Sequence, residues 1–563
     1  MVEPGACCRL SLARSRPAPR ARAPDHPHAV VPIQMSRLRT LAFAALLSVA
    51  GIPLAAQQTR AERTAGVETS SYTDVIGFLD SLARRTPEVR LGTLGQSSEG
   101  RWLPWVLAAR PMVEDPAAAA RSGKPVIYLQ ANIHAGEVEG KEAALMLLRD
   151  LTVGTLAPLL DSVILLVVPI YNADGNERLG PGERHRPGQN GPAVVGLRAN
   201  GQGLDLNRDY VKLEAPESRA ALALLAAWDP DLFIDLHTTN GSYHGYALTW
   251  SPGLNPNSSP ANDYARDRFL PTLRERMRRR HRVETFPYGN FRNQEPDSLV
   301  QGWETYDARP RFGTNAAGLR GRIPILSEAY SNDPYPVRIR ATYLFVREIL
   351  SLAAEDRMAI RRVVAASDRW RPDSVALGSV LAPPRLDEVI AELTFADGDG
   401  SHGFARRRRS GTFRTIRMPV FDRFAGTERV SRPAGYLLPP AYSHLVTLLR
   451  IQGVQVARLR GSWSGAAEAF TVDSVRAAPF VFEGHRTVAV RGAWRPATAE
   501  ATPGWYFVST DQRLGAFAVV LLEPASEDGF ATWNLLDRDL RRAAALPLFR
   551  LPAPPDASLE LLP

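Results

Sequence analysis

The sequence predicts an α/β domain with a mainly parallel, mixed sheet flanked by helices, followed by a mostly β domain. Over residues 72–370, apolar runs of strand length alternate with segments of helical periodicity, as in sheets covered by helices. Over residues 375–563, long helical periodicity fades, and short runs rich in Val, Phe and Thr alternate with Gly and Pro turns. The length of 563 residues suggests two or three domains, and the hydrophobic content of 45% allows a sizeable core to be buried.

The elements expected in the first domain follow in chain order. Residues 72–85 carry apolar side chains at helical spacing, and residues 162–170 form a continuous apolar run, which is typical of a strand buried on both faces. The other expected elements are a hairpin of 90–94 and 103–109, strands at 126–131, 232–236 and 323–326, and helices at 139–151, 215–228 and 337–354. In such a sheet, ligand sites form at the carboxyl ends of the strands.

The second domain is expected to hold short apolar β segments and a few helical pieces. The expected segments are 470–472, 487–490, 504–508 and 515–522, with a helical piece at 443–452. The charged run Arg406–Arg409 is interpreted as a solvated loop. The role of this domain stays open between a packing or folding partner for the first domain and an adhesion or carbohydrate-binding module.

The beginning of the chain predicts export. Met35 and the basic residues after it precede an apolar run and then small residues, which is the pattern of a secretory signal peptide over residues 35–57. That run is too short to span a bilayer, so no membrane span is expected after cleavage. Residues 1–34 are interpreted as a mis-assigned N-terminal extension, and residues 58–71 as a disordered lead-in. The mature protein is therefore expected in the periplasm or outside the cell.

Composition excludes several kinds of site. Nearly all positively charged residues are arginines, and the net charge of +9 is spread along the chain. No stripe of basic and aromatic residues is present, so no nucleic-acid partner is expected. Cys7 and Cys8 are the two cysteines and both lie in the extension, so the mature chain has no disulfide, thiolate ligand or cysteine nucleophile. Any metal must be held by His, Asp or Glu. The sequence also contains no Gly-x-Ser-x-Gly elbow and no phosphate-binding loop.

Two expected strand ends carry candidate metal ligands. The strand that ends at Ala131 runs into His134-x-x-Glu137, and the strand at 232–236 runs into His237. Zinc accepts imidazole nitrogens and carboxylate oxygens, and catalytic zinc sites use three protein ligands and a water molecule. The His-x-x-Glu spacing alone is a weak signal, because it is common by chance, and a buried histidine that ends a strand is the plain alternative for His237.

Further polar residues stand at loops and strand ends in the same region. Asn207 and Arg208 form an exposed pair that suits a carboxylate, since a guanidinium offers a fork of donors. Arg198 precedes this pair, and Glu328 ends the strand that begins at 323. A carboxylate at the end of a buried strand is costly unless it is paired or functional.

In this order, His134-x-x-Glu137, Asn207-Arg208, His237 and Glu328 resemble the carboxypeptidase A-like zinc peptidase family over about residues 70–355. The segment 171–175 is similar to the Asn-Pro-Asp-Gly segment of that family. The resemblance implies the zinc carboxypeptidase-like fold, one zinc ion, and the removal of C-terminal residues from peptides that end in a free carboxylate.

The resemblance also implies a role for each matched position. It assigns zinc binding to His134, Glu137 and His237, the general base to Glu328, oxyanion stabilisation to Arg198, recognition of the terminal carboxylate to Asn207 and Arg208, and orientation of His134 to Asp205. The chemistry agrees, because zinc lowers the pKa of bound water to about 7 and a nearby base can complete the proton transfer.

Two further residues are candidates for the same cleft. Tyr306 has suitable spacing before Glu328 for the tyrosine that closes over the substrate in this family, although an ordinary loop tyrosine is the alternative. His244 follows His237 closely and is a candidate for the cleft lining. The residue that selects the substrate side chain is not placed, and the segment Arg309–Arg322 is a candidate for shaping that pocket.

Three functional hypotheses follow. The leading one is a metallocarboxypeptidase, and its alternative within the same chemistry is an amidase that acts on peptidoglycan peptides or small molecules. The hypothesis from a different class is a non-catalytic exported binding protein that retains the fold. The sequence leaves the substrate side chain and the oligomeric state open.

Overall fold

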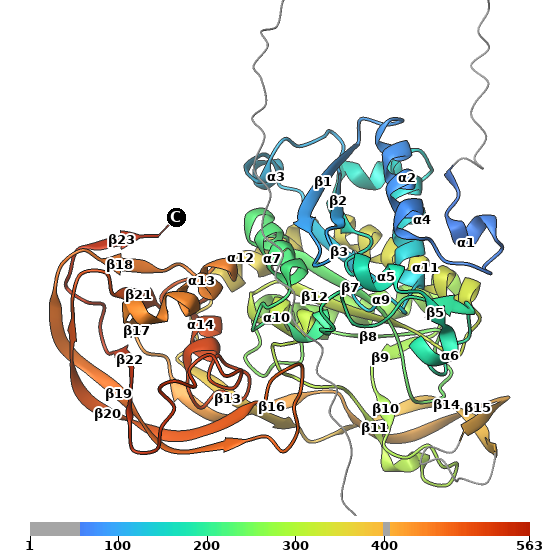
Figure 1. Cartoon of the computed structure of the whole chain (residues 1–563). Helices are drawn as coiled ribbons and strands as arrows, with labels where there is room; N and C mark the ends of the chain where they lie inside the picture. Colours follow the sequence, from blue (N-terminus) through green and yellow to red (C-terminus); the bar gives the residue numbers. More distant parts are fainter. Residues whose placement is uncertain (1–56, 398–405, 563) are drawn as a thin grey trace, which may run out of the picture. The chain divides into compact units, whose positions relative to one another are not determined.

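The computed structural model describes residues 57–397 and 406–562 (Figure 1). The predicted extension at 1–34, with Cys7 and Cys8, lies outside the described residues, as does the predicted signal peptide at 35–57 apart from Gln57. Among the helices of the described part, none is long and apolar enough to cross a membrane.

A mixed eight-stranded sheet forms the centre of the first part of the chain, in the order β1-β2-β4-β3-β7-β12-β8-β9. Its strands are β1 Val89–Gln96, β2 Trp102–Ala108, β3 Val126–Ala131, β4 Ile164–Val168, β7 Leu232–Thr238, β8 Leu248–Ser251, β9 Thr285–Pro287 and β12 Ile323–Ala329. Strands β4, β3, β7 and β12 run parallel to one another, and β1, β2 and β8 join this core in antiparallel pairs. The predicted fold class is confirmed.

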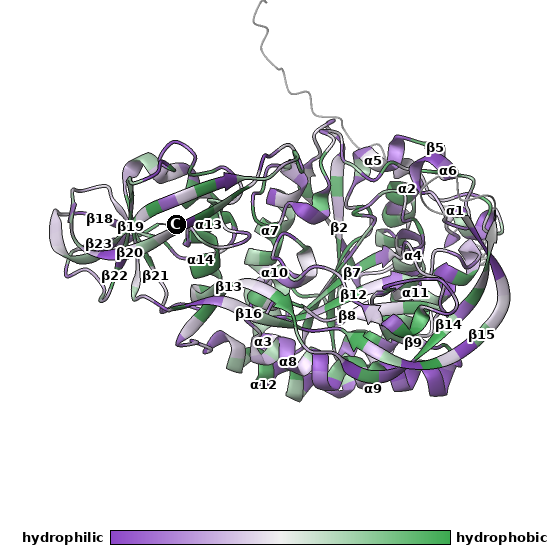
Figure 2. Ribbon diagram, turned by 90° about the horizontal axis from the view of Figure 1, so that it is seen from below, coloured by the Kyte–Doolittle hydropathy of each residue, from purple (hydrophilic) through white to green (hydrophobic). Residues whose placement is uncertain are grey.

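Both faces of this sheet are covered, because alternate residues of its strands enter different hydrophobic cores. Ile127 and Leu129 of β3 pack in one core with residues of α2 (Tyr72–Ala83), α4 (Glu139–Thr152) and α11 (Tyr335–Glu355). Tyr128 packs in another core with residues of α7 (Pro216–Trp228). Strand side chains alternate between faces, so a continuous apolar run is the expected sequence for such a strand. Figure 2 shows hydrophobic stretches on the central strands.

The segment at 58–71 differs from the predicted disordered lead-in. Thr59 and Glu62 form a capping box that starts helix α1 (Arg60–Arg63). The backbone N–H of Ser70 then donates a hydrogen bond to Glu142 Oε1 at 2.6 Å. The segment is polar in composition, but specific caps and tertiary hydrogen bonds order it, which a composition argument does not detect.

The later part of the chain is rich in β structure. A seven-stranded sheet has the order β20-β19-β22-β17-β21-β18-β23. Its strands are β17 Gly435–Leu438, β18 Ala457–Leu459, β19 Trp463–Ala477, β20 Val488–Ala501, β21 Tyr506–Ser509, β22 Ala545–Leu551 and β23 Leu559–Leu561. A two-stranded sheet pairs β13 (Ser374–Leu381) with β16 (Phe424–Ser431), and helix α13 spans Ser443–Ile451.

Strands from the two parts of the chain also pair with each other. A four-stranded sheet has the order β10-β11-β15-β14. In it, β10 (Asn290–Phe291) and β11 (Trp303–Glu304) join the long strands β14 (Arg385–Asp397) and β15 (Arg406–Phe421). The core that contains Tyr128 likewise includes Phe517 and Val519 from the later part. The two parts therefore share buried surface.

Two expectations for the later part are wrong. Residues 515–522, expected as a β segment, form helix α14 (Gly515–Leu522), in which every side chain is buried. A short apolar run buried on all sides fits a strand and a helix equally well, so periodicity cannot separate them. The run Arg406–Arg409, expected as a solvated loop, lies in strand β15, where Arg409 Nε donates to Glu392 Oε2 at 2.7 Å.

Candidate metal centre and its cleft

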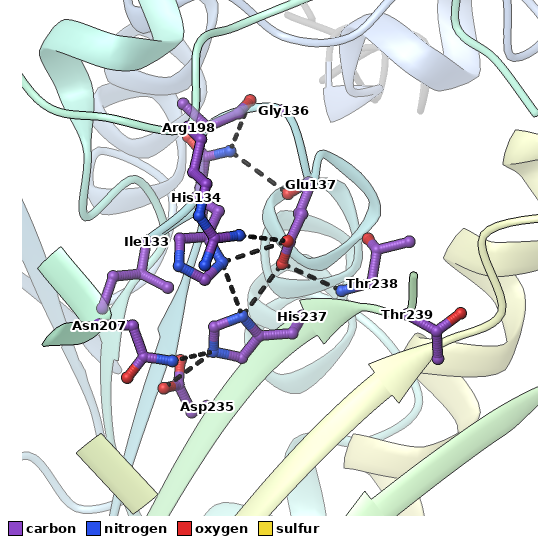
Figure 3. Close-up of polar contacts among 12 residues, drawn as sticks. Ile133, His134, Gly136, Glu137, Arg198, Asn207, Asp235, His237, Thr238 and Thr239 are labelled. Atoms are coloured by element: carbon purple, nitrogen blue, oxygen red, sulfur yellow. Dashed lines mark hydrogen bonds and ion pairs between the residues drawn. The ribbon is translucent and has the colours of Figure 1, made fainter. Parts of the chain in front are cut away.

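Three side chains from two strand ends converge on one point. Asn132, at a left-handed φ of +62°, turns the chain after β3 and brings His134 and Glu137 back to the edge of the sheet, and His237 projects from β7. Figure 3 shows the two rings and the carboxylate facing one another. The Glu137 carboxylate lies 3.1 Å from His134 Nδ1 and 3.0 Å from His237 Nδ1, and the two Nδ1 atoms are 3.2 Å apart.

This donor set fits a metal ion. Among the described residues, His134, Glu137 and His237 form the one group of His, Cys, Asp or Glu side chains close enough to hold an ion. A tetrahedral zinc ion with bonds of about 2.0–2.1 Å places its ligand atoms about 3.3 Å apart, close to the separations found here. All three side chains are buried, so a bound cation would balance the charge of the Glu137 carboxylate.

Each histidine has a carboxylate on its other ring nitrogen. His134 Nε2 lies 3.0 Å from Asp205 Oδ1, and His237 Nε2 lies 3.0 Å from Asp235 Oδ2. Such partners fix the tautomer so that Nδ1 is free to bind a metal. Sequence reasoning missed Asp235. The available signal was its position two residues before His237 on one strand, which places both side chains on the same face.

The register of the sheet places Glu328 beside the candidate metal ligand His237. In the parallel pair β7–β12, Glu328 is the partner of His237, so the two side chains lie on one face of the sheet. Burial raises the pKa of the Glu328 carboxyl to about 8; His237 opposes this shift and Glu137 adds to it. A cation bound next to this carboxyl would favour its ionised form.

Two arginines face the Glu137 carboxylate. Arg198 Nη1 lies 3.5 Å from Glu137 Oε1, and its Nη2 donates to Asp205 Oδ2 at 2.8 Å. Arg186 Nη2 lies 3.2 Å from the same Glu137 oxygen and donates to Thr239 O at 3.0 Å. Burial opposes ionisation of Glu137, but Arg186 and His134 outweigh it and hold the pKa of this carboxyl well below its usual range. Sequence reasoning missed Arg186, because it lies in a loop and its distance in sequence from the other candidate residues follows no recognisable pattern.

Asn207 and Arg208 stand on a short 3₁₀ turn, Leu206–Arg208, next to the ligands. Asn207 Oδ1 accepts a hydrogen bond from Gly313 N at 2.9 Å, which ties this turn to the start of helix α10 (Gly313–Leu319). The Arg208 guanidinium stacks over Phe312 with 4.0 Å between Cζ and the ring centroid. Burial lowers the pKa of Arg208, and Asp205 partly offsets this. Arg208 thus presents a preorganised cation to the cleft.

The three candidate metal ligands, Glu328, Arg198, Asn207 and Arg208 line one cavity of about 140 Å³, whereas Asp205, Asp235 and Arg186 are not part of its lining. Its walls are His134, Glu137, Arg198, Asn207, Arg208, His237, Thr238, Asn240, Tyr288, Tyr306, Phe312, Thr314, Leu326 and Glu328. The cavity therefore joins a candidate metal-binding triad, the carboxyl group of Glu328 and cationic side chains in one space.

The comparisons with known proteins agree with this geometry. Residues 75–298 match the model of the zinc carboxypeptidase family. Over these residues, the chain is similar to a zinc carboxypeptidase domain. The matched residues include the three candidate ligands and the Asn207–Arg208 pair, whereas Tyr306 and Glu328 lie beyond them. The resemblance to this family and the enzyme class, a metallocarboxypeptidase, are thereby confirmed.

Relatives extend the similarity beyond this domain. The chain is 26% identical to carboxypeptidase 2 of Trichophyton rubrum over 500 residues, which cover 84% of this chain and 85% of that one. It is 32% identical to carboxypeptidase D of Mus musculus over 136 residues, 22% of this chain and 10% of that one. Carboxypeptidase A from Helicoverpa armigera aligns structurally over 52% of this chain and 74% of its own, with 16% identity and a TM-score of 0.39.

Of the two remaining candidates for the cleft, Tyr306 lines the cavity and His244 does not. Tyr306 lies in the cavity wall, with its ring 5.6 Å from that of Tyr288 and 5.3 Å from that of Phe312. His244 does not line this cavity: it is buried, its ring 4.2 Å from that of Tyr330, and burial lowers its pKa to about 3. Nearness in sequence to His237 does not carry His244 to the cleft, because the chain turns away after β7.

Proposed function

We propose that this protein is a zinc-dependent hydrolase that removes C-terminal residues from peptides, with one zinc ion held by His134, Glu137 and His237. The observation that carries the proposal is the convergence of these three ligand atoms in the same cavity as Glu328 and Arg208. A peptide's last amide bond and its terminal carboxylate lie only a few ångströms apart, so one small cavity can hold both.

Zinc at this site supplies Lewis-acid chemistry, namely polarisation of a carbonyl group and a lowered pKa of water. Glu328 acts as the general base: its carboxylate takes a proton from water and passes it to the leaving amine. Support comes from its place beside His237 in the sheet and from its buried, proton-binding environment. A base held in this way contributes about 10²–10⁴-fold to the rate.

The cationic side chains have separate tasks in this proposal. Arg198 is partly exposed and fixed by Asp205, and it stabilises the negative charge that develops on the carbonyl oxygen. Asn207 and Arg208 bind the terminal carboxylate of the substrate, and Tyr306 closes the wall over the departing residue. Asp205 orients His134 through the contact between its Oδ1 and Nε2.

A comparison of substrates with and without a free C-terminal carboxylate tests the proposal. Purified protein loaded with zinc is incubated with a peptide mixture, with the same peptides amidated at the C-terminus, and with cell-wall muropeptides, and products are read by mass spectrometry. Stepwise loss of C-terminal residues from the free-acid peptides alone is expected. Cleavage confined to muropeptides would replace the general exopeptidase with the cell-wall amidase, and cleavage of the amidated peptides would remove Arg208 from its role.

Replacement of the base separates an enzyme from a binding protein. Glu328→Gln is expected to keep its zinc, measured by metal analysis, and to lose at least about 100-fold in kcat. Full activity in this variant would end the role of Glu328. Absence of hydrolysis in both wild type and variant, with zinc bound in each, would favour a non-catalytic binding protein.

We further infer that the enzyme works outside the cytoplasm, in the periplasm or the medium, from the signal-peptide pattern at residues 35–57. Cell fractionation with an antibody against the mature protein tests this. Protein retained in the cytoplasm with residues 35–57 intact would contradict it.

A further inference from the structure

A tight turn of the later part of the chain contacts the loop that carries the candidate substrate-binding residues. The turn lies in the connection between strands β19 and β20. In it, Phe482 N donates to His485 O at 2.8 Å, and His485 N donates to Phe482 O at 2.9 Å. The two residues between them, Glu483 and Gly484, have φ values of +49° and +78°. This is the two-residue hairpin loop with both central residues left-handed.

Glutamate is an unusual residue for the first central position of such a turn. Asn, Asp and Gly are preferred there, because other L-residues crowd the backbone at positive φ. Strained backbone positions of this kind persist where surrounding contacts hold them, and they are concentrated at functional sites. The Glu483 side chain has such a contact, since its Oε2 accepts a hydrogen bond from the backbone N–H of Asp205 at 2.9 Å.

Asp205, whose backbone N–H donates this hydrogen bond, also contacts several residues of the candidate site through its carboxylate. The Asp205 carboxylate contacts His134 Nε2 at 3.0 Å, accepts from Arg198 Nη2 at 2.8 Å, and accepts from Asn207 N at 2.9 Å to start the 3₁₀ turn. Fixing the Asp205 amide therefore fixes the beginning of the turn that presents Asn207 and Arg208.

The hairpin turn is held against the first part of the chain on both sides of Glu483. His485 Nε2 lies 2.8 Å from Glu214 Oε1. The Phe482 ring lies 5.3 Å from the Arg311 guanidinium, and Arg311 in turn forms a buried ion pair of 2.6 Å with Asp528. Arg311 immediately precedes Phe312, the ring on which Arg208 stacks. Residues of the later part thus support the Arg208 region from two directions.

We propose that Glu483 is a positioning residue for substrate binding, supplied by the later part of the chain through its hydrogen bond to Asp205 N. This inference rests on the proposed function, in which Asn207 and Arg208 bind the terminal carboxylate. It assigns the turn Phe482–His485 to the assembly of the substrate site and gives the later part of the chain a role there.

The test uses the full chain and three variants. Glu483→Gly removes the acceptor while relieving the positive-φ strain, Glu483→Gln retains an acceptor oxygen, and Glu428→Gly is the matched control. Glu428 also has a φ of +49°, and it is an exposed glutamate in β16, the strand that pairs with β13. Kinetics on a free-acid peptide, thermal unfolding and hydrogen exchange of the segment around Asp205 are measured for each.

Glu483→Gly is expected to raise KM on the order of tenfold, as for loss of one charge-assisted hydrogen bond, with kcat within about twofold. Its Tm should not fall, because glycine favours this backbone conformation. The Asp205 amide should exchange faster in this variant. Glu483→Gln should stay within about threefold of wild type in KM, and Glu428→Gly should change neither KM nor exchange.

Two results would overturn the inference. One is an unchanged exchange rate of the Asp205 amide in Glu483→Gly, and the other is a fall in Tm and kcat with KM unchanged, as for a purely structural turn residue. The exchange measurement does not depend on hydrolysis. If the wild type fails to cleave the peptide, the proposed function fails, and the exchange result still decides whether Glu483 holds the loop.

Discussion

Asp235 offers a sharp test of the metal centre, because its carboxylate is fully buried behind a candidate ligand. Among the described residues, its one ion-pair partner is His237 Nε2 at 3.0 Å, and neither carboxylate oxygen has a well-formed hydrogen bond. A carboxylate in such a place is costly unless it serves the histidine. We predict that Asp235 keeps the proton of His237 on Nε2 and so leaves Nδ1 for zinc.

The magnitude follows from what each substitution leaves behind. In Asp235→Asn, the amide oxygen can still accept from Nε2–H but carries no charge, so zinc affinity should fall about tenfold, or about 1.4 kcal/mol. In Asp235→Leu, which has the same branching of heavy atoms and no acceptor, the loss should approach about 100-fold, near 2.7 kcal/mol. The graded order, wild type above Asn above Leu, is the expected signature of a hydrogen-bonded outer partner.

The assay is competition for zinc with a chromophoric chelator at one fixed pH, because proton release accompanies zinc binding. Asp231→Asn is the matched control: Asp231 is also buried and directly precedes β7, where it accepts from Val126 N at 2.8 Å. The control should lose thermal stability and keep its zinc affinity. Equal affinities for wild type and both Asp235 variants would refute the role of Asp235 and weaken the assignment of His237 as a ligand.

Three further predictions concern other parts of the molecule. In Arg208→Lys, the lysine cannot reproduce both the stacking on Phe312 and a forked contact with a carboxylate. KM for free-acid peptides should therefore rise about tenfold or more with zinc content unchanged. An unchanged KM would contradict the carboxylate site. Burial lowers the pKa of Lys141 to about 8 from an unfolded value of 10.5. The unfolded state then binds more protons between these pH values, so the unfolding free energy should rise by up to about 3 kcal/mol across this window in wild type and lack that rise in Lys141→Met, as chemical denaturation at several pH values can show. A chain cut after residue 370 should fail to fold stably, because it loses the Asp528 partner of buried Arg311 and part of a shared core; a cooperative thermal transition in that fragment would contradict this.

The sheet and the convergence of the three candidate metal ligands could be predicted from the sequence, because both follow from local patterns. The strands β3, β4 and β7 are short apolar runs, and a strand buried on both faces leaves that trace in any chain. His134 and Glu137 follow β3, and His237 lies near the end of β7, so their convergence follows from parallel strands that end at one edge. Helix α14 was missed because its eight apolar residues are buried on all sides and carry no periodicity.

The side chains that support the site were harder to predict, since they come from distant segments or from positions without a pattern. Arg186 reaches Glu137 from a loop, and its sequence neighbours give no sign of it. Glu483 is 278 residues from Asp205, and its contact depends on how a late hairpin folds back onto the first domain. Asp235 was accessible in principle, because the two-residue alternation of a strand places it on the face of His237.

The candidate metal ligands and the residues that position the carboxylate site place different demands on the fold. A metal ion imposes its own geometry, so the three ligands need only approach one another, and the edge of a parallel sheet achieves this. In the proposed function, recognition of a terminal carboxylate has no such external template, so Arg208 has to be positioned by the residues around it. Here Phe312 stacks on it, Asn207 binds Gly313, and Glu483 holds the Asp205 amide at the start of the turn. The later part of the chain thus adds one hydrogen bond, accepted by Glu483, to the support of the proposed carboxylate site.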